Sequence, residues 1–293
     1  MVIAPLPGLT PRVAVVTVSY GSAEVLDPFL SSIPGASTSP VLVVVADNKP
    51  EGDSDASRVA LSHGASYLHL AENRGYGGGM NAAAATLPDF VDWILISNPD
   101  VVLDPSSIDL LVAAGSDDPE IGAVGPAVLT PEGAVYPSAR SIPSLRNGVG
   151  HALFANLWGN NPWTRAYRND VEGTPEPRDA GWLSGSCLLV RRSAFVELGG
   201  FDDSFFMYFE DVDLGYRLTR AGYRNVYLPS ASVVHSGAHA TTKDSALMVQ
   251  AHHDSAKKFL RKKYRGPFLW PIRAGLGLGL TVRSALVTRR LPR

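Results

Sequence analysis

The chain has 293 residues, of which 45% are hydrophobic and 18% charged, a composition typical of a globular protein with one large α/β domain or two smaller ones. Its single cysteine, Cys187, excludes a disulfide framework and a zinc site built from cysteines, and it fits a reducing compartment. Residues 1–11 contain three prolines and neither a basic segment nor an apolar run, so we expect no secretory signal.

The formal net charge of −2 conceals an asymmetric distribution. Residues 255–293 hold eleven Lys or Arg and no acid, whereas residues 1–254 hold 15 basic and 28 acidic side chains. The apolar run 272–287 is interrupted by Arg273 and Arg283, so it is too short and too charged to span a bilayer. We expect this tail to lie as a helix on an anionic membrane surface. Packing on the protein's own core is the main alternative, and nucleic acid is the least favoured partner.

Strand and helix patterns alternate along the first hundred residues. This alternation predicts an α/β fold with an open, mainly parallel twisted sheet flanked by helices. Continuous apolar runs predict buried strands at 13–19, 41–46 and 93–97, a short strand is expected at 67–70, and helices are expected at 21–30, 54–63 and 79–87.

The second half of the chain is less regular. Residues 130–177 have no clear period and are interpreted as a partly helical insertion over the ligand site. Beyond it we expect a strand at 182–190, helices at 192–198 and 212–221, and a strand at 225–234 broken at Pro229. The predicted division is a domain at 12–240 and a helical, basic, membrane-surface segment at 241–293.

Polar residues follow the predicted strands at their carboxyl ends, where open α/β sheets bind ligands. Asp47 can accept hydrogen bonds from a nucleotide base or ribose, or form an Asx turn. Asp100, in an Asn-Pro-Asp turn, can bind a divalent ion that bridges two phosphates. His235 follows a later strand and either completes that metal site, contacts a diphosphate or is structural.

The glycine-rich segment 73–81 precedes a predicted helix. Glycine lets the backbone approach a ligand closely, and a helix N-terminus favours phosphate. Its spacing is not that of the dinucleotide fingerprint, and a tight structural turn is the alternative.

The segment 201–214 combines five acids with a run of aromatic side chains. Because an unpaired carboxylate is costly to bury, two interpretations are open. The acids form a capping and ion-pairing device, or one of them is a general base tuned by its surroundings.

Read in order, seven segments resemble the inverting glycosyltransferase family 2, which has the GT-A fold, and the resemblance covers roughly residues 12–240. The segments are Asp47-Asn48, Asn73-Arg-Gly-Tyr-Gly77, Asn98-Pro-Asp100, Gly185-Ser-Cys-Leu-Leu-Val-Arg-Arg192, Gly199-Gly-Phe-Asp202, Glu210-Asp-Val-Asp-Leu214 and Val234-His-Ser-Gly237.

The resemblance implies that Asp211 is the catalytic base, and that Asp100 and His235 lie at a site for Mg²⁺ or Mn²⁺. Two departures from the family pattern are Lys49, in place of a small hydroxyl residue, and Asn98, in place of an acid. The implied nucleotide-sugar residues are Tyr20, Asp47, Asn48, Asn73, Arg74, Gly75, Tyr76, Gly77, Asn81 and Asn98, and the implied acceptor or orienting residues are Glu210, Asp213 and Trp182.

Four further segments resemble actinobacterial rhamnosyltransferases within this family: Tyr136-Pro-Ser-Ala-Arg140, Ile142-Pro-Ser-Leu145, Gly150-His-Ala-Leu153 and Asn161-Pro-Trp-Thr-Arg165. Such enzymes move L-rhamnose from dTDP-rhamnose onto an N-acetylglucosaminyl-diphospho-polyprenol in cell-wall synthesis. The resemblance therefore implies a cytoplasmic enzyme on the inner face of the cell membrane. Use of another donor such as UDP-galactofuranose, nucleotidyl transfer, and a non-catalytic nucleotide-sugar-binding role are the alternatives.

Overall fold

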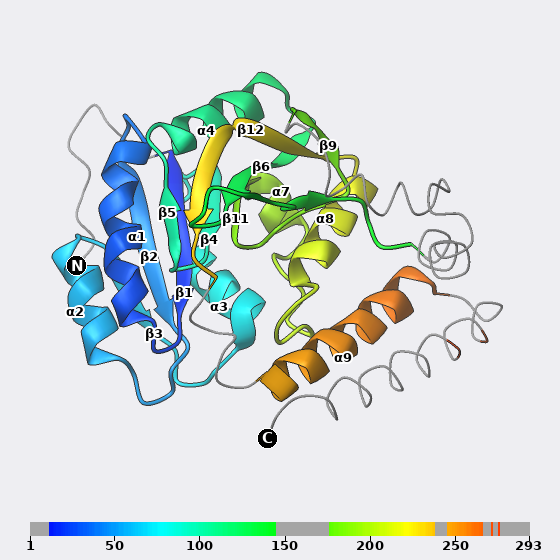
Figure 1. The fold of residues 1–293 in the computed structure, drawn as a ribbon, viewed down its shortest axis with the longest axis horizontal. Coiled ribbons are helices and arrows are strands. Elements are labelled where there is room, and N and C mark those ends of the chain that lie inside the picture. The colour runs from blue at the N-terminus through cyan, green and yellow to red at the C-terminus, as the bar shows by residue number, and fades with distance from the viewer. Residues whose placement is uncertain (1–11, 145–175, 238–244, 266–270, 272–274, 276–293) are drawn as a thin grey trace.

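A computed structural model describes residues 12–144, 176–237, 245–265, 271 and 275. A ten-stranded sheet in the order β3-β2-β1-β4-β11-β6-β12-β5 runs through it, with β7 beside β6 and β9 beside β12 (Figure 1). The strands are β1 (Val13–Ser19), β2 (Val41–Asp47), β3 (Ser66–His69), β4 (Trp93–Ser97), β5 (Val101–Leu103), β6 (Ile121–Leu129), β7 (Val135–Tyr136), β9 (Arg178–Ala180), β11 (Cys187–Arg191) and β12 (Arg224–His235). A separate two-stranded sheet pairs β8 (Ala139–Arg140) with β10 (Trp182–Leu183).

Helices cover both faces of the main sheet. Buried side chains of α1, α2 and α4 form one cluster with the sheet, and those of α3, α7 and α8 form another on the opposite face. Their bounds are α1 (Ala23–Ala36), α2 (Ser54–Ser62), α3 (Gly75–Ala84), α4 (Ser107–Asp117), α7 (Arg192–Glu197) and α8 (Glu210–Arg220).

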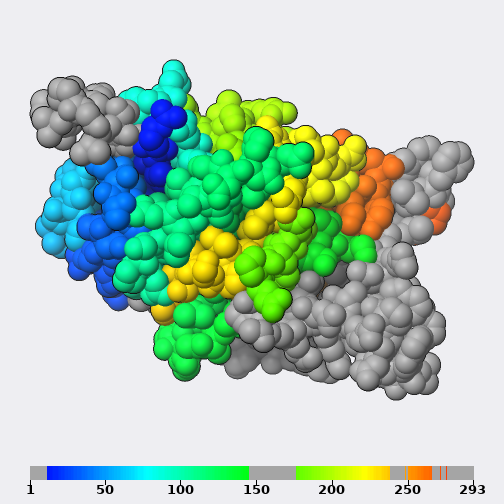
Figure 2. All heavy atoms as spheres, turned by 90° about the horizontal axis from the view of Figure 1, so that it is seen from above, coloured from blue at the N-terminus to red at the C-terminus, as the bar shows by residue number. Residues whose placement is uncertain are grey.

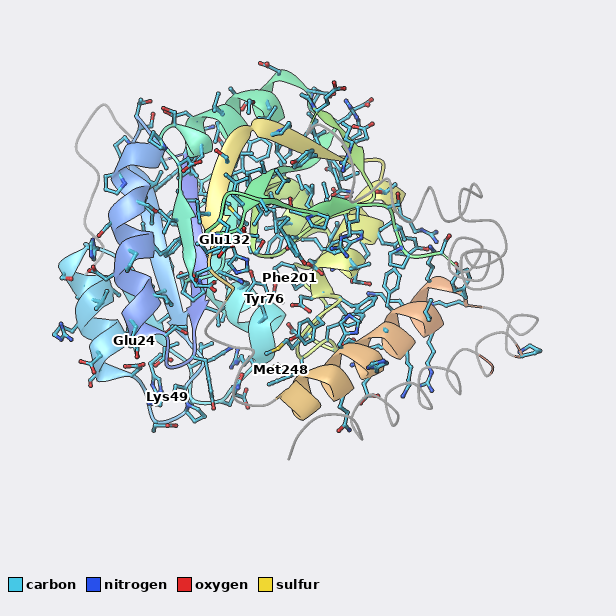
Figure 3. The ribbon with its side chains drawn as sticks, in the orientation of Figure 1. Glu24, Lys49, Tyr76, Glu132, Phe201 and Met248 are labelled. Atoms are coloured by element: carbon cyan, nitrogen blue, oxygen red, sulfur yellow. The ribbon has the colours of Figure 1, made fainter. Side chains whose placement is uncertain are left out.

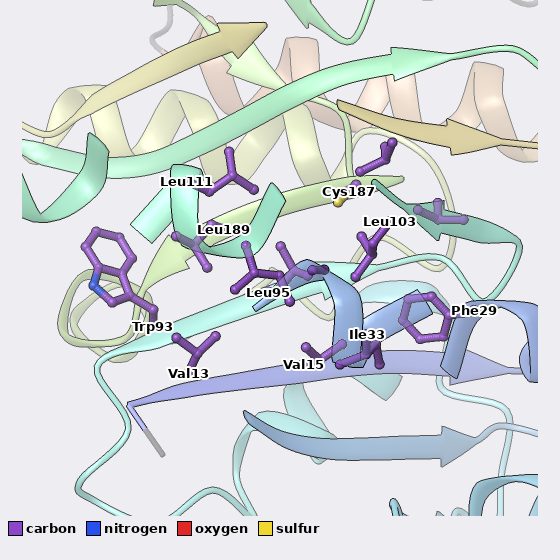
Figure 4. Packing of buried hydrophobic residues seen from close by; sticks show 14 of the residues in the cluster. Val13, Val15, Phe29, Ile33, Trp93, Leu95, Leu103, Leu111, Cys187 and Leu189 are labelled. Carbon is purple, nitrogen blue, oxygen red and sulfur yellow. The ribbon is translucent and has the colours of Figure 1, made fainter. Parts of the chain in front are cut away.

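The central strand β1 shows why its sequence is apolar throughout. All seven of its residues are buried, with Val13 and Val15 in one cluster and Ala14, Val16 and Val18 in the other. Figure 4 shows the first cluster, in which Val13 and Val15 pack with side chains of α1 and β4. A strand covered on both faces has no solvent face, so the alternation of apolar and polar residues disappears.

Parallel pairing joins β3, β2, β1 and β4, while β11 lies antiparallel between β4 and β6. The expected α/β class and flanking helices are confirmed, and the sheet is mixed.

Several expected boundaries were wrong. Helix α1 continues to Ala36 despite Pro28 and Pro34, because burial of its apolar face outweighs the local propensity. The strand expected at 182–190 is divided into β10 and β11 by a turn, and the break expected at Pro229 is a register shift within one strand, β12. Strand β5 and helix α4 were not predicted.

The C-terminal helix α9 (Ser245–Lys263) lies beside α8, at the opposite end of the molecule from α1 and α2 (Figures 1 and 2). In the described parts of the chain, no helix is long and apolar enough to cross a membrane. The expected insertion lies mostly outside the described residues, as does nearly all of the predicted membrane-surface segment beyond residue 265.

Two helical glycines provide a matched test of packing in this core. A Cβ on Gly115 of α4 would lie 2.5 Å from the buried Trp93 ring, whereas a Cβ on Gly35 of α1 would meet nothing within 4 Å. Gly115→Ala should therefore lower the free energy of unfolding by about 1–3 kcal/mol. Gly35→Ala should leave it unchanged or raise it by up to about 1 kcal/mol. Urea unfolding of both variants tests this, and equal effects would contradict the packing.

Candidate active site

Parallel pairing brings the predicted polar residues to one edge of the sheet. Ser19 at the end of β1 lies opposite Asp47 at the end of β2, and β4 ends beside β1 immediately before Asn98. Strand β12 ends at His235, which lies opposite Val101, the residue after Asp100. Residues from four strands thus converge on this edge, as the sequence predicted.

Asn98, Asp100 and His235 form a contiguous group. His235 Nε2 lies 3.1 Å from Asp100 Oδ1 and 3.2 Å from Asn98 Nδ2. Burial acts to raise the pKa of Asp100, but the hydrogen bond and charge of His235 outweigh it and hold that pKa below its ordinary value of 3.8. A carboxylate and an imidazole in contact are chemically suited to one divalent cation.

The 3.1 Å distance between Asp100 Oδ1 and His235 Nε2 also suits two adjacent ligands of one ion. Donor atoms at about 2.1 Å from an octahedral ion are about 3 Å apart. No cluster of three or more acidic, His or Cys side chains in the described residues is suited to hold a metal. Such an ion would therefore take its remaining ligands from water and substrate phosphates, a common arrangement for Mg²⁺.

Asp47 is fully buried at the end of β2. Its Oδ1 accepts the Lys49 N–H at 3.0 Å, which forms the Asx turn of the structural alternative, and its Oδ2 accepts the Tyr67 hydroxyl at 2.6 Å. Burial and the hydrogen bond to Asp47 raise the pKa of Tyr67 to about 12. A contact between Asp47 and a nucleotide base stays a prediction. Nothing in the sequence distinguishes Tyr67 from the other residues of its strand as a partner of Asp47.

The glycine-rich segment is held by two asparagines. Asn48 Nδ2 donates to Gly75 O at 2.7 Å, and Asn73 Oδ1 accepts the Gly75 N–H at 3.0 Å. Gly75 has φ +71°, and a Cβ there would collide with the carbonyl of Phe206. These contacts show a structural turn that begins α3, and direct contact of Asn48, Asn73 or Gly75 with a donor stays a prediction.

Asn81 and Gly77 join α3 to the segment 201–214, which carries the five acids. Asn81 Nδ2 donates to Phe201 O and Asp203 Oδ1, and Asn81 Oδ1 accepts the Phe201 N–H. A Cβ on Gly77 would lie 2.9 Å from Phe201 Cβ. The observed contacts of Asn81 and Gly77 are therefore within the protein, and their predicted part in donor binding is untested.

Two of the predicted donor residues have fewer internal contacts. Tyr20 follows β1 and is 59% exposed. Arg74 lies at the N-terminus of α3, with Nε 3.3 Å from Glu72 Oε1 in an exposed ion pair. Both side chains are accessible to a ligand.

Asp211 lies in the first turn of α8. Its Oδ2 accepts the Gly185 N–H at 2.9 Å, and its Oδ1 accepts the Val212 N–H at 2.8 Å. The Tyr76 hydroxyl donates to Gly185 O, and its ring lies edge-on to Phe201 near the centre of the molecule (Figure 3). Burial raises the pKa of Asp211 above its ordinary value, against the lowering effect of the Gly185 hydrogen bond.

Glu210 shares this buried environment. Burial and the charge of Asp211 raise its pKa to about 8, and its Oε2 is buried with no hydrogen-bond partner among the described residues. Amide hydrogen bonds favour the ionised form of Asp211, whereas Glu210 has only its own backbone amide. The surroundings therefore act differently on the two carboxyls: the amide hydrogen bonds of Asp211 act to lower its pKa, whereas burial and the charge of Asp211 raise the pKa of Glu210.

Asp213 has a different environment from its neighbours. Its side chain is fully buried, with Arg217 Nε at 2.6 Å and Lys262 Nζ, from α9, also at 2.6 Å. Lys262 also pairs with Asp202 at 2.7 Å, and this helps to hold the pKa of Asp202 at about 2 against the opposing effect of burial. The geometry favours the ion-pairing alternative for Asp213 over contact with an acceptor.

Helix α9 braces the turn that precedes the acids. Tyr208 and Phe209 adopt positive φ values of 66° and 67°, which are unfavourable for bulky side chains. Ser255 donates to Met207 O at 2.8 Å, and the buried Phe259 ring packs against Phe209. For residues 245–263 this contact supports the alternative that the basic segment packs on the protein's own core.

Trp182 lies on β10 against α8. A Cβ on Gly215 would be 2.7 Å from Trp182 Cα, and the indole Nε1 donates to Ser141 O at 3.2 Å. Its contact with an acceptor stays a prediction.

The mixed, mainly parallel sheet is flanked by helices, has the Asp100–His235 pair at its edge, and has the buried carboxylate of Asp211 hydrogen-bonded to a backbone amide. This is the arrangement of the GT-A class of sugar transferases. A family model described as "Glycosyltransferase like family 2" matches residues 11–254. The chain belongs to glycosyltransferase family 2, and it is a glycosyltransferase.

The chain is 43% identical to the N-acetylglucosaminyl-diphospho-decaprenol L-rhamnosyltransferase of Mycobacterium tuberculosis H37Rv, across 96% of this chain and 94% of that protein. It is 28% identical to the rhamnosyltransferase WbbL of Escherichia coli K12, across 86% of this chain and 93% of that protein.

Similar folds occur in solved structures. The mannosyltransferase PcManGT of Pyrobaculum calidifontis, in complex with GDP-Man and Mn²⁺, matches 99% of this chain and 79% of its own with a TM-score of 0.61 at 16% identity. GalNAc-T7 with UDP, GalNAc and Mn²⁺ matches 78% of this chain and 44% of its own, with a TM-score of 0.56 at 16% identity. These likenesses establish the fold alone.

The raised pKa of Glu210 predicts a dependence of stability on pH. In the unfolded chain Glu210 ionises near 4.5, whereas in the folded protein it ionises near 8. Between these values only the folded state holds the proton, so this contribution is complete below about pH 4.5 and is lost as the pH rises towards 8. Glu210→Gln should lose less stability than the wild type between pH 5 and 8 in urea unfolding. The exposed control Glu51→Gln should follow the wild type, and equal slopes for all three would contradict the prediction.

The Lys262 ion pairs predict a second effect on stability. Lys262→Met leaves the buried Asp213 with one cationic partner fewer, so the free energy of unfolding should fall by about 1.5–3 kcal/mol. The control Lys257→Met, on the same helix, removes a pair with Asp254, which is 59% exposed, and should cost less than about 1 kcal/mol. Chemical unfolding measures both, and equal losses would contradict the bracing by Lys262.

Proposed function

We propose that this protein is an inverting rhamnosyltransferase that moves L-rhamnose from dTDP-L-rhamnose onto N-acetylglucosamine carried by a polyprenyl diphosphate, in synthesis of the linker between peptidoglycan and arabinogalactan. The observation that carries the proposal is the 43% identity, over nearly the whole length of both chains, to the N-acetylglucosaminyl-diphospho-decaprenol L-rhamnosyltransferase of Mycobacterium tuberculosis. The site supports it, since a buried carboxylate lies near a sheet edge suited to a nucleotide diphosphate.

Asp211 is the proposed base. Its carboxylate takes the proton from an acceptor hydroxyl as that oxygen forms a bond to the anomeric carbon of the donor, on the face opposite the nucleotide. The bond from the anomeric carbon to the diphosphate breaks, and dTDP leaves with the electron pair. Proton removal by a placed carboxylate typically contributes about 10²–10⁴-fold to the rate.

The donor side is assigned to the sheet edge. Asp47 and Tyr20 are the proposed contacts of the nucleoside, and Arg74 and the N-terminus of α3 are the proposed contacts of phosphate. Asp100 and His235 would hold Mg²⁺ or Mn²⁺, which supplies positive charge against the leaving diphosphate when bound. The 3.1 Å contact between these two side chains supports this assignment.

The C-terminal segment 241–293 is proposed to hold the enzyme at the inner face of the cell membrane, where a polyprenyl-linked acceptor resides. Its support is the charge of residues 255–293, which include eleven basic and no acidic side chains. Lys262 and Phe259 point into the protein, so α9 also belongs to the folded domain.

Asp211→Asn separates donor binding from chemistry. With Mn²⁺ present, dTDP-rhamnose should raise the melting temperature of the wild type and of the variant alike, because the variant keeps the shape of the site. Transfer to a diphosphate-linked N-acetylglucosamine acceptor should fall by about 10²–10⁴-fold in the variant. The exposed control Asp254→Asn should transfer normally.

The same melting-temperature measurement, repeated with UDP-sugars, tests the identity of the donor. Stabilisation by UDP-sugars but not by dTDP-rhamnose would overturn the rhamnosyl assignment, and near-normal transfer by Asp211→Asn would overturn the role of Asp211.

A further inference from the structure

Arg140 lies between two aromatic rings, on a strand that pairs with β10. The guanidinium carbon of Arg140 is 5.7 Å from the centroid of the Tyr136 ring and 5.9 Å from that of the Trp182 ring. Arg140 Nε donates to Pro137 O at 2.8 Å, and antiparallel pairing places Arg140 opposite Trp182. The backbone and both rings therefore fix the position of this charge.

No acid among the described residues neutralises the charge of Arg140. Among the described residues, no carboxylate lies within 4.0 Å of its guanidinium, whereas Arg217 and Arg224 both pair with Asp side chains. A fixed, uncompensated guanidinium beside a ligand site favours an anion, and its planar fork suits phosphate oxygens.

Arg140 also lies near the proposed base. Strand β10, which pairs with Arg140, leads into the turn at 184–186, where Gly185 N–H binds Asp211. The charge of Arg140 contributes to lowering the pKa of Asp211, so the two groups are near each other although they form no ion pair.

We propose that Arg140, held between Tyr136 and Trp182, binds the phosphate attached to the acceptor sugar and so selects diphosphate-linked acceptors over neutral glycosides. The proposal rests on the proposed function and assigns the acceptor side of that site. The exposed face of Tyr136, which is 44% exposed, offers an apolar wall next to the same phosphate.

The test compares two acceptors with the same sugar and alkyl chain, an alkyl N-acetylglucosaminyl diphosphate and a neutral alkyl N-acetylglucosaminide. Arg140→Ala should raise KM for the diphosphate at least about 10-fold, the loss expected for a charge-assisted hydrogen bond, and leave KM for the neutral acceptor within about twofold. Arg140→Lys should recover part of the loss, because it keeps the charge without the fork. Arg178→Ala is the control, since Arg178 donates to Ala139 O of the same strand but stacks on Tyr227.

Three outcomes overturn the inference. An equal loss with both acceptors, with a shifted pH–rate profile, would show that Arg140 acts only through Asp211. A raised KM for the donor with both acceptors would place Arg140 on the donor side. If the wild type transfers to neither acceptor, the proposed function itself fails and this inference fails with it.

Discussion

The backbone of Gly185 joins the two halves of the site. Its N–H donates to Asp211 at the start of α8, and its carbonyl accepts the hydroxyl of Tyr76 from α3. The carbonyl of the next residue, Ser186, accepts the N–H of Asn98 at the sheet edge. One turn between β10 and β11 therefore fixes the base relative to the carboxylate–imidazole pair. An acceptor hydroxyl and a donor diphosphate can meet only if these positions agree, and backbone hydrogen bonds specify them without depending on mobile side chains.

The three acids at the start of α8 illustrate how environment divides similar groups into different roles. Asp213 is neutralised by Arg217 and Lys262 and anchors the helix to α9. Glu210 is buried without such partners, and burial and the charge of Asp211 raise its pKa to about 8, while two amide hydrogen bonds favour the charged form of Asp211. The C-terminal helix thus contributes to the active site by stabilising the turn before these acids, in addition to any part in membrane attachment.

The sequence predicted those features that have a local signal. Continuous apolar runs marked β1, β2 and β4, and the polar residues that follow them lie at one sheet edge as expected. The turn at 184–186 was missed because small residues there interrupt an apolar run only briefly. The pairing of Asp213 with Lys262 joins residues distant in the chain, so no local pattern encodes it. The contact of Tyr67 with Asp47 was missed for the same reason, since it depends on tertiary structure.

In the proposed mechanism one carboxylate, Asp211, activates the acceptor for a single displacement. The decisive measurement is the anomeric configuration of the transferred sugar, compared by NMR in donor and product. Inversion is expected, because the acceptor attacks from the face opposite the departing dTDP. Retention of configuration would contradict it, since retention requires a covalent intermediate or attack from the same face.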